Sequence, residues 1–221
     1  MLDSPKAAKT RVISIALTLS AVLAAALTPV TARVSSRPKS VAVWSSVPLA
    51  VAIALPLAWS ASQVSTLNLV FALALGAVSA ILATQVVIDL CVRRLLRELS
   101  YAGLAVLLLG SFFLDPVHGS GISGLLIGAL VMTAVTALLV LVSRGALGLG
   151  DLHLSPLLGA LIGWFSPGAV LFAWMIIAVA GALFTTVGLA TKRLTRGTMI
   201  PYGPFMVFGT VASVAVIAIR S

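Results

Sequence analysis

Residues 66–90 read TLNLVFALALGAVSAILATQVVIDL, and the only ionisable side chain in this stretch is Asp89, near its end. As an α-helix the stretch would extend about 37 Å, at about 1.5 Å per residue. The hydrocarbon core of a bilayer is about 30 Å thick and requires roughly 20 apolar residues of helix. The stretch therefore predicts a membrane-spanning helix that ends with a carboxylate near one face of the bilayer.

Apolar segments that approach or reach the same length occur along the whole chain. Hydrophobic residues make up 61% of the 221 residues and charged residues only 9%, against about 25% charged residues in soluble domains. So few charges do not solvate a globular surface, and lipid is the expected solvent. We predict an all-α, polytopic membrane helix bundle of about eight transmembrane helices, with residues 1–221 forming a single integral membrane domain. The other predicted spans are roughly 12–32, 41–59, 99–114, 121–142, 152–165, 168–190 and 203–219.

The charge distribution predicts an orientation. The chain has 14 basic and 5 acidic residues, a net charge of +9. In a soluble protein this balance would favour nucleic acid as a partner, but here the basic residues cluster between apolar segments. Every second connection lies on the same side of the membrane, and the loops on that side hold ten of the 14 basic residues. These loops are 33–40, 91–98, 143–150 and 191–202. The positive-inside rule places that side in the cytoplasm, and we expect a lipid bilayer and no nucleic acid as partner.

The N-terminal segment has two interpretations. Its basic start, its apolar run and Val30-Thr31-Ala32 are also typical of a secretory signal peptide. Cleavage there would leave Arg33, Arg37 and Lys39 at the new outer terminus, against the positive-inside rule. We therefore expect residues 12–32 to span the membrane, which places the basic N-terminus outside.

Four of the five acidic residues lie within or between the predicted spans: Asp89, Glu98, Asp115 and Asp151. Carboxylates in or near a bilayer are costly and are candidates for function. Two predicted spans separate Asp89 from Asp151, so both are expected at the cytoplasmic face. One span separates Asp115 from each of them, which places Asp115 at the opposite face. The spacing therefore pairs Asp89 with Asp151 and excludes Asp115.

Each acid also has a structural interpretation. Asp151 precedes an apolar run, where Asp is a favoured N-cap, whereas Asp89 lies near a helix C-terminus, where the macrodipole disfavours an anion. Glu98 follows three arginines and is expected in a solvated ion pair. Asp115 is expected in a turn, and with His118 it supplies too few ligands for a metal. The sequence predicts no metal site and no cofactor.

Three motifs, in order along the chain, resemble those of one protease family. They are VIDLCVRRL at 87–95, GLGDLHL at 148–154 followed by LGA at 158–160 and GW at 163–164, and IPYGPF at 200–205. They match the first-aspartate, GxGD and C-terminal I-P-[FY]-G-P motifs of the type IV prepilin peptidases, which the chain resembles over residues 86–209. The short form without the cysteine-rich methyltransferase insert is the nearer likeness. The chain departs from the family pattern at Leu96-Arg97, where the family has Pro-Asn, and at His153, where it has lysine.

The resemblance implies a membrane-embedded aspartyl endopeptidase of the bacterial cytoplasmic membrane, with a peptidase-like core at about 66–219. Asp89 and Asp151 would form its catalytic dyad. The implied substrate is a prepilin-like protein with a single apolar N-terminal helix, whose short basic leader is cut on the cytoplasmic side during type IV pilus assembly or secretion. Substrate-binding or site-shaping roles are expected for Gly148, Gly150, His153, Pro201, Gly203 and Pro204.

Other functions remain open at this point. Gly121-Ile122-Ser123-Gly124 with His153 fits a serine-protease pattern, but a span separates Ser123 from His153 by roughly 30 Å. The aspartates and glycines also suit a small transporter, whose site belongs near the midplane. The departures at Leu96, Arg97 and His153 fit a catalytically degraded homologue in pilus assembly. Small residues are expected to permit close helix packing: Gly121, Ser123, Gly124 and Gly128 in the fifth span, and Gly76, Ala80, Ala83, Gly159 and Gly163 between the third and sixth.

Overall fold

A computed structural model describes residues 5–35, 39–64, 69–112, 120–143, 147–195 and 200–220. These residues form α-helices with short connections and contain no β-strand, so the all-α prediction is confirmed for the described part of the chain. The helices are α1 (Pro5–Ala26), α2 (Thr28–Ser35), α3 (Lys39–Val64), α4 (Leu69–Val92), α5 (Arg97–Phe112), α6 (Gly121–Val142), α7 (Leu149–Phe165), α8 (Ala169–Ala190) and α9 (Gly203–Arg220).

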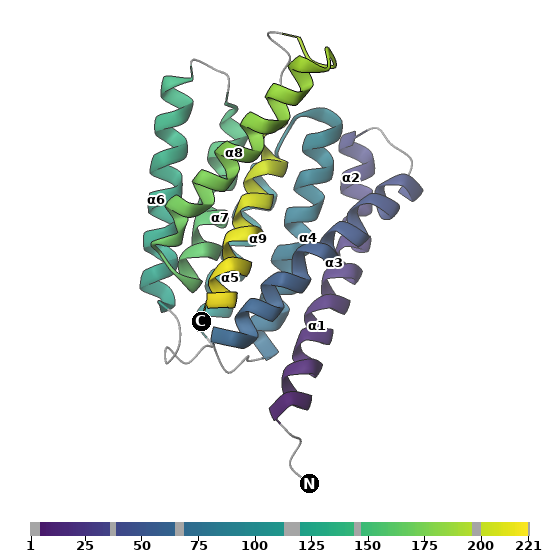
Figure 1. Ribbon diagram of the computed structural model, residues 1–221. Helices are drawn as coiled ribbons and strands as arrows, with labels where there is room; N and C mark the ends of the chain where they lie inside the picture. The colour runs from purple at the N-terminus through teal and green to yellow at the C-terminus, as the bar shows by residue number, and fades with distance from the viewer. Residues whose placement is uncertain are drawn as a thin grey trace.

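The helices run alternately up and down in one bundle (Figure 1). Helices α1 and α2 form one upward pass that bends by 42° where they meet, and each later helix reverses direction. Every predicted apolar segment coincides with one of these passes. By length and apolarity, four helices are able to cross a membrane, and the bent α1–α2 pair makes a fifth. These helices indicate a membrane protein.

Helix α4 occupies the centre of the bundle. It packs against α1, α3, α5 and α9, and 89% of an 18-residue apolar stretch within it is buried in the protein. Helices α6 and α8 lie at the outside, with only 22% of each span buried. Their exposed residues are large and apolar, such as Leu130, Leu141, Leu171 and Leu183. Such a surface suits contact with lipid chains, because water would not solvate it.

The closest helix packing joins α6 and α7 through glycines. A methyl group added at Gly128 would lie 2.2 Å from the carbonyl oxygen of Gly159, and one added at Gly124 would lie 2.6 Å from that of Gly163. Only glycine permits this approach, so the packing role expected of Gly124 and Gly128 is confirmed. Gly121 instead takes a positive φ of 60° and has no neighbour within 4 Å of an added methyl group.

The predicted packing between the third and sixth spans through small residues is wrong. Gly159 and Gly163 face α6, and Gly76 faces α1, where an added methyl group would lie 2.7 Å from the carbonyl oxygen of Ala16. Helices α4 and α7 instead meet through the rings of Phe71 and Trp164, whose centroids lie 4.1 Å apart. Small residues permit close packing but do not specify the partner, because every helix here is apolar.

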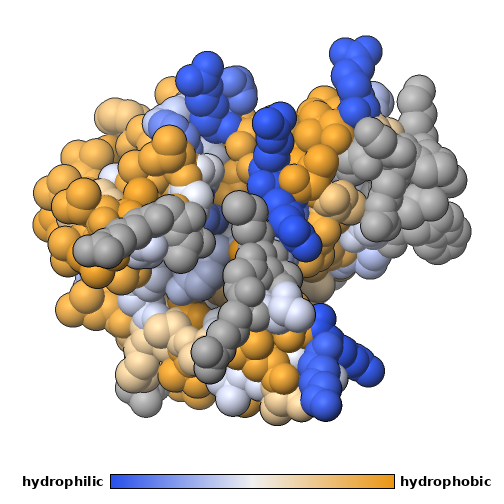
Figure 2. Space-filling view, turned by 90° about the horizontal axis from the view of Figure 1, so that it is seen from above, coloured by the Kyte–Doolittle hydropathy of each residue, from blue (hydrophilic) through white to orange (hydrophobic). Residues whose placement is uncertain are grey.

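One end of the bundle gathers the connections that carry the sequence motifs. The C-terminus of α4 and the N-termini of α5, α7 and α9 lie at the upper end in Figure 1, opposite the start of α1 and the end of α9. Figure 2 looks down on this end, where hydrophilic side chains stand among a mostly apolar surface. Asp115 and His118, together with Arg37, Arg144 and Arg196 of the basic loops, lie outside the described residues.

Candidate functional site

Asp89 lies in the last turn of α4, and its side chain is held by another helix. The side chain is 5% exposed, and the backbone N–H of Gly203 donates to its Oδ2 at 3.0 Å. Gly203 is the first residue of α9, where the N–H groups have no partners within the helix and the dipole favours an anion. The N-terminus of α9 therefore offsets the unfavourable position of Asp89 at the C-terminus of α4.

Glycine at position 203 is required by this contact. A methyl group added there would lie 2.8 Å from Asp89 Oδ2 and 3.3 Å from Leu95 Cδ2. Both distances are shorter than ordinary van der Waals contact. The site-shaping role predicted for Gly203 thus has a concrete steric basis, namely access of its N–H to the carboxylate.

Asp151 is the third residue of α7, and its side chain is 6% exposed. The backbone N–H of Gly148 donates to its Oδ2 at 3.1 Å, while the N–H of Asp151 donates to the carbonyl oxygen of Gly148 at 3.1 Å. The N-cap position belongs to Gly148, so Asp151 is not the N-cap that one interpretation of the sequence expected. Its carboxylate still contributes to capping, because it accepts from the N–H of the cap residue.

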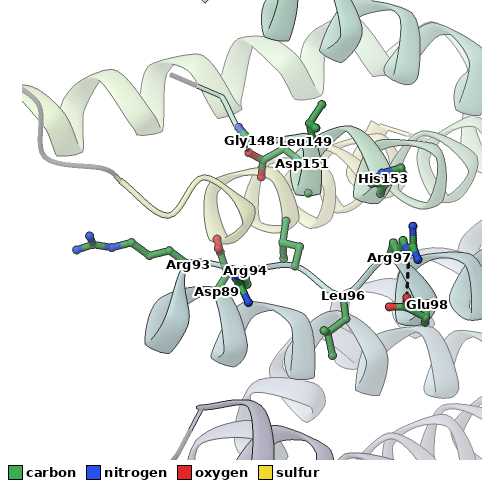
Figure 3. A pocket seen from close by; sticks show the side chains of 12 residues that line it. Asp89, Arg93, Arg94, Leu96, Arg97, Glu98, Gly148, Leu149, Asp151 and His153 are labelled. Atoms are coloured by element: carbon green, nitrogen blue, oxygen red, sulfur yellow. Dashed lines mark hydrogen bonds and ion pairs between the residues drawn. The ribbon is translucent and has the colours of Figure 1, made fainter. Parts of the chain in front are cut away.

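The two carboxylates face each other across one cavity of about 490 Å³. Figure 3 shows Asp89 pointing up from α4 and Asp151 pointing down from α7, on opposite walls of this cavity. The sequence predicts both at one end of the bundle, and the structure places both there. The residues that line the cavity are Asp89, Arg93, Arg94, Leu95, Leu96, Arg97, Glu98, Gly148, Leu149, Gly150, Asp151 and His153.

Neither glycine of the GxGD motif has a positive φ, and only Gly150 has a close packing neighbour. Gly148 has φ −79° and ψ 152°, and Gly121 is the only described glycine with positive φ. A methyl group added at Gly150 would lie 3.1 Å from Leu95 Cβ. Gly150 therefore permits close approach of the connector between α4 and α5, while its predicted role toward substrate stays a prediction.

The connector between α4 and α5 forms one wall of the cavity, and a buried amide fixes it. Helix α4 ends at Val92, and the next residue, Arg93, has φ 54° and donates its N–H to the carbonyl oxygen of Asp89 at 2.8 Å. Gln85, which is 0% exposed, makes hydrogen bonds to both backbone groups of Leu96 and to Ser100. The sequence interpretation missed Gln85, although a lone amide one turn before Asp89 in an apolar helix is a usable signal.

Charged and polar side chains line the outer part of the cavity. Arg97 Nε donates to Glu98 Oε1 at 2.9 Å, with side chains that are 69% and 70% exposed. The predicted ion pair of Glu98 is thus present, and its exposure makes it a weak contributor to stability. Tyr101 Oη and His153 Nδ1 form a hydrogen bond of 2.9 Å. This contact joins α5 to α7 at the edge of the cavity.

The third motif leads into α9. Pro204 occupies the first turn of this helix, where a missing N–H has no cost, and Tyr202 stacks on Trp174 with ring centroids 6.4 Å apart. Burial raises the pKa of the Tyr202 phenol, and the nearby Asp151 carboxylate raises it further. Pro201 and Pro204 are not among the described residues that line the cavity. They lie on either side of Gly203 in the sequence, and their site-shaping role stays a prediction.

The serine-protease pattern is not assembled. Ser123 lies at the lower end of α6, where its Oγ donates to the carbonyl oxygen of Ser120 at 2.9 Å. His153 lies at the cavity near the upper end (Figure 3), about 33 Å away for a helix of this length. Within the described part of the chain, no three His, Cys, Asp or Glu side chains form a group able to hold a metal ion.

Comparison with known proteins gives no match to any family model, curated protein or solved structure.

Proposed function

We propose that this protein is a membrane-embedded aspartyl endopeptidase of the type IV prepilin peptidase kind. The observation that carries the proposal is the pair of nearly buried carboxylates, Asp89 and Asp151, which face each other in one cavity. One oxygen of each accepts a backbone N–H. No other hydrogen bond to either carboxylate occurs within the described part of the chain, which leaves capacity to bind a water and a peptide carbonyl.

The chemistry follows from the proximity of the two carboxylates. Two carboxylates that act on one water do not both ionise readily, so the proposed pair shares one proton. The ionised carboxylate accepts a proton from water as that water attacks the scissile carbonyl, and the protonated carboxyl group donates a hydrogen bond to the carbonyl oxygen. The carboxyl group that took the proton from water passes it to the amide nitrogen as the C–N bond breaks, which leaves one product with a carboxylate and the other with an amine. The dyad acts as a coupled unit, and neither residue is assigned alone as base.

The bundle suits a substrate that is itself a membrane helix. We take the eight passes, α1 with α2 and then α3 to α9, as eight spans of the bacterial cytoplasmic membrane, with the cavity on the cytoplasmic side. The 16 residues of α5 and the 17 of α7 are close to the shortest helices that cross a bilayer. A prepilin-like protein with one apolar helix would lie beside this bundle and present its basic leader to the cavity, in pilus assembly or secretion.

Cleavage of a co-expressed prepilin-like protein tests the proposal. Asp89→Asn and Asp151→Asn are each expected to abolish cleavage, because either change leaves only one carboxyl group and no partner with which to share the proton. Both variant proteins are expected to accumulate in the membrane. Ser123→Ala and Asp115→Asn are the matched controls and are expected to cleave normally. Near wild-type cleavage by either dyad variant refutes the aspartyl mechanism, and loss of cleavage in Ser123→Ala would return the serine alternative.

Two alternative functions differ from this proposal, one in where its acidic residues lie and the other in the result of the cleavage assay. A transporter needs its acidic residues near the membrane midplane, whereas both aspartates lie at one end of the bundle. A catalytically degraded homologue would cleave no prepilin-like substrate even as wild type. The replacement of Pro-Asn by Leu96-Arg97 supports that alternative less than the sequence alone suggests, because Gln85 holds this connector at Leu96.

A further inference from the structure

Gln85 is a buried amide that bridges α4 to the start of α5. Its Nε2 donates to the carbonyl oxygen of Leu96 at 2.7 Å and to Ser100 Oγ at 2.9 Å, and its Oε1 accepts the N–H of Leu96 at 2.9 Å. The side chain is 0% exposed, so both donors and the acceptor are matched inside the bundle. A buried amide retained in an apolar helix is costly unless it is matched in this way.

These hydrogen bonds fix the residue at the start of α5 through its own backbone groups, without capping the first turn of the helix. Leu96 immediately precedes α5, and its apolar side chain offers no oxygen to the free N–H groups of the first turn. Its own N–H and carbonyl oxygen are both bound by Gln85. The end of the connector is therefore fixed from α4, the helix that carries Asp89 one turn further on.

The connector in turn touches the backbone that holds each carboxylate. Leu95 packs against Gly150, where an added methyl group would lie 3.1 Å from Leu95 Cβ. The same side chain packs against Gly203, where an added methyl group would lie 3.3 Å from Leu95 Cδ2. Gly150 directly precedes Asp151, and the N–H of Gly203 holds Asp89. Leu95 is thus a spacer between the two halves of the site.

We propose that Gln85 is a positioning residue which, by fixing Leu96 and hence Leu95, sets the placement of Asp89 relative to Asp151. The consequence for catalysis rests on the proposed function, whereas the consequence for geometry does not. Gln85 is not among the described residues that line the cavity, so it acts through the connector and not on substrate. A misplacement of about 1 Å lowers a rate by as much as about a hundredfold.

The geometric consequence is tested without any activity. In a Cys91→Ala background, which removes the only cysteine, Asp89→Cys and Asp151→Cys are joined by a short bifunctional thiol reagent. Adding Gln85→Leu is expected to slow this crosslinking about fivefold or more, because the connector loses two hydrogen bonds at Leu96 and α5 loses one at Ser100. Thr84→Val is the matched control: Thr84 is adjacent, 0% exposed, and its Oγ1 has no hydrogen-bond partner. Equal crosslinking rates in the Gln85→Leu and Thr84→Val proteins overturn the proposal.

The catalytic consequence is measured on cleavage of a prepilin-like substrate. Gln85→Leu is expected to lower kcat by about tenfold to a hundredfold with KM within about threefold, whereas Thr84→Val leaves both unchanged. If the Gln85→Leu protein does not accumulate, the kcat of Ser100→Ala is measured instead, because this substitution removes one of the three hydrogen bonds of Gln85. A kcat below that of Thr84→Val supports positioning, and an equal kcat refutes it. If the wild type cleaves nothing, the proposed function fails, and the crosslinking comparison still decides the role of Gln85.

Discussion

Replacing Gly203 with alanine tests whether the N-terminus of α9 holds Asp89 in its working position. The new methyl group would lie 2.8 Å from Asp89 Oδ2 and 3.3 Å from Leu95 Cδ2. Both neighbours must move, and the hydrogen bond of 3.0 Å from the Gly203 N–H to the carboxylate is lost or lengthened. The backbone itself tolerates alanine, because Gly203 is not among the glycines with positive φ.

The expected magnitude comes from that hydrogen bond. A hydrogen bond to a charged group contributes about 1.5–3 kcal/mol, and each 1.36 kcal/mol corresponds to about a tenfold change in rate. Gly203→Ala is therefore expected to lower kcat for prepilin cleavage by roughly tenfold to a hundredfold. Helix propensity favours alanine over glycine by up to about 1 kcal/mol, so the amount of folded protein is not expected to fall on that account.

Gly148→Ala provides the contrast that makes the test sharp. Gly148 also donates its N–H to a site carboxylate, but a methyl group there would lie 3.5 Å from Asp151 Oδ2, an ordinary contact. Its activity is expected to stay within about threefold of wild type. Gly168→Ala, with no neighbour within 4 Å of the added methyl group, controls for the substitution itself. Full activity of Gly203→Ala would refute the role assigned to α9, as would equal losses in Gly203→Ala and Gly148→Ala.

Two further predictions concern topology and packing. In a Cys91→Ala background, a cysteine replacing Ser143 is expected to react with a membrane-impermeant thiol reagent from the cytoplasm and one replacing Ser120 from outside; the reverse pattern would invert the orientation and remove the cytoplasmic cavity. Gly128→Ala places a methyl group 2.2 Å from the carbonyl oxygen of Gly159, so overpacking of about 1–3 kcal/mol is expected to lower the thermal unfolding midpoint in detergent. An unchanged midpoint relative to Gly168→Ala would contradict the tight α6–α7 contact.

Helix positions could be predicted from the sequence because they depend on apolar length. The predicted segment 121–142 coincides with α6, and the prediction for 152–165 misses only the first turn of α7, which contains Gly150 and Asp151. Helix neighbours could not be predicted in this way. Helices α4, α6 and α8 are all strongly apolar, yet 89% of an 18-residue apolar stretch of α4 is buried and only 22% of such a stretch in each of the others. Lipid and protein interior are similarly apolar, so hydrophobicity does not distinguish a central helix from a peripheral one.

The candidate site was predictable as a pair of residues but not as a structure. Counting spans between Asp89 and Asp151 places both carboxylates at one end of the bundle, and the structure places them in one cavity. Counting spans cannot identify the groups that hold them. The contact between Gln85 and Leu96 joins residues 11 positions apart across the end of a helix, and no periodic pattern marks such a contact.

The position of Asp89 shows why local rules fail where two helices meet. At the C-terminus of α4 the macrodipole disfavours a carboxylate, and considered alone this would argue for a protonated or displaced side chain. The residue that reverses the local field, Gly203, is 114 positions away and donates the first free N–H of α9. Asp151 occupies the corresponding place at the N-terminus of its own helix, α7. Each carboxylate is therefore stabilised by a helix N-terminus through one oxygen. Among the described residues neither carboxylate forms an ion pair, and these two backbone N–H groups supply part of the stabilisation that a buried charge requires.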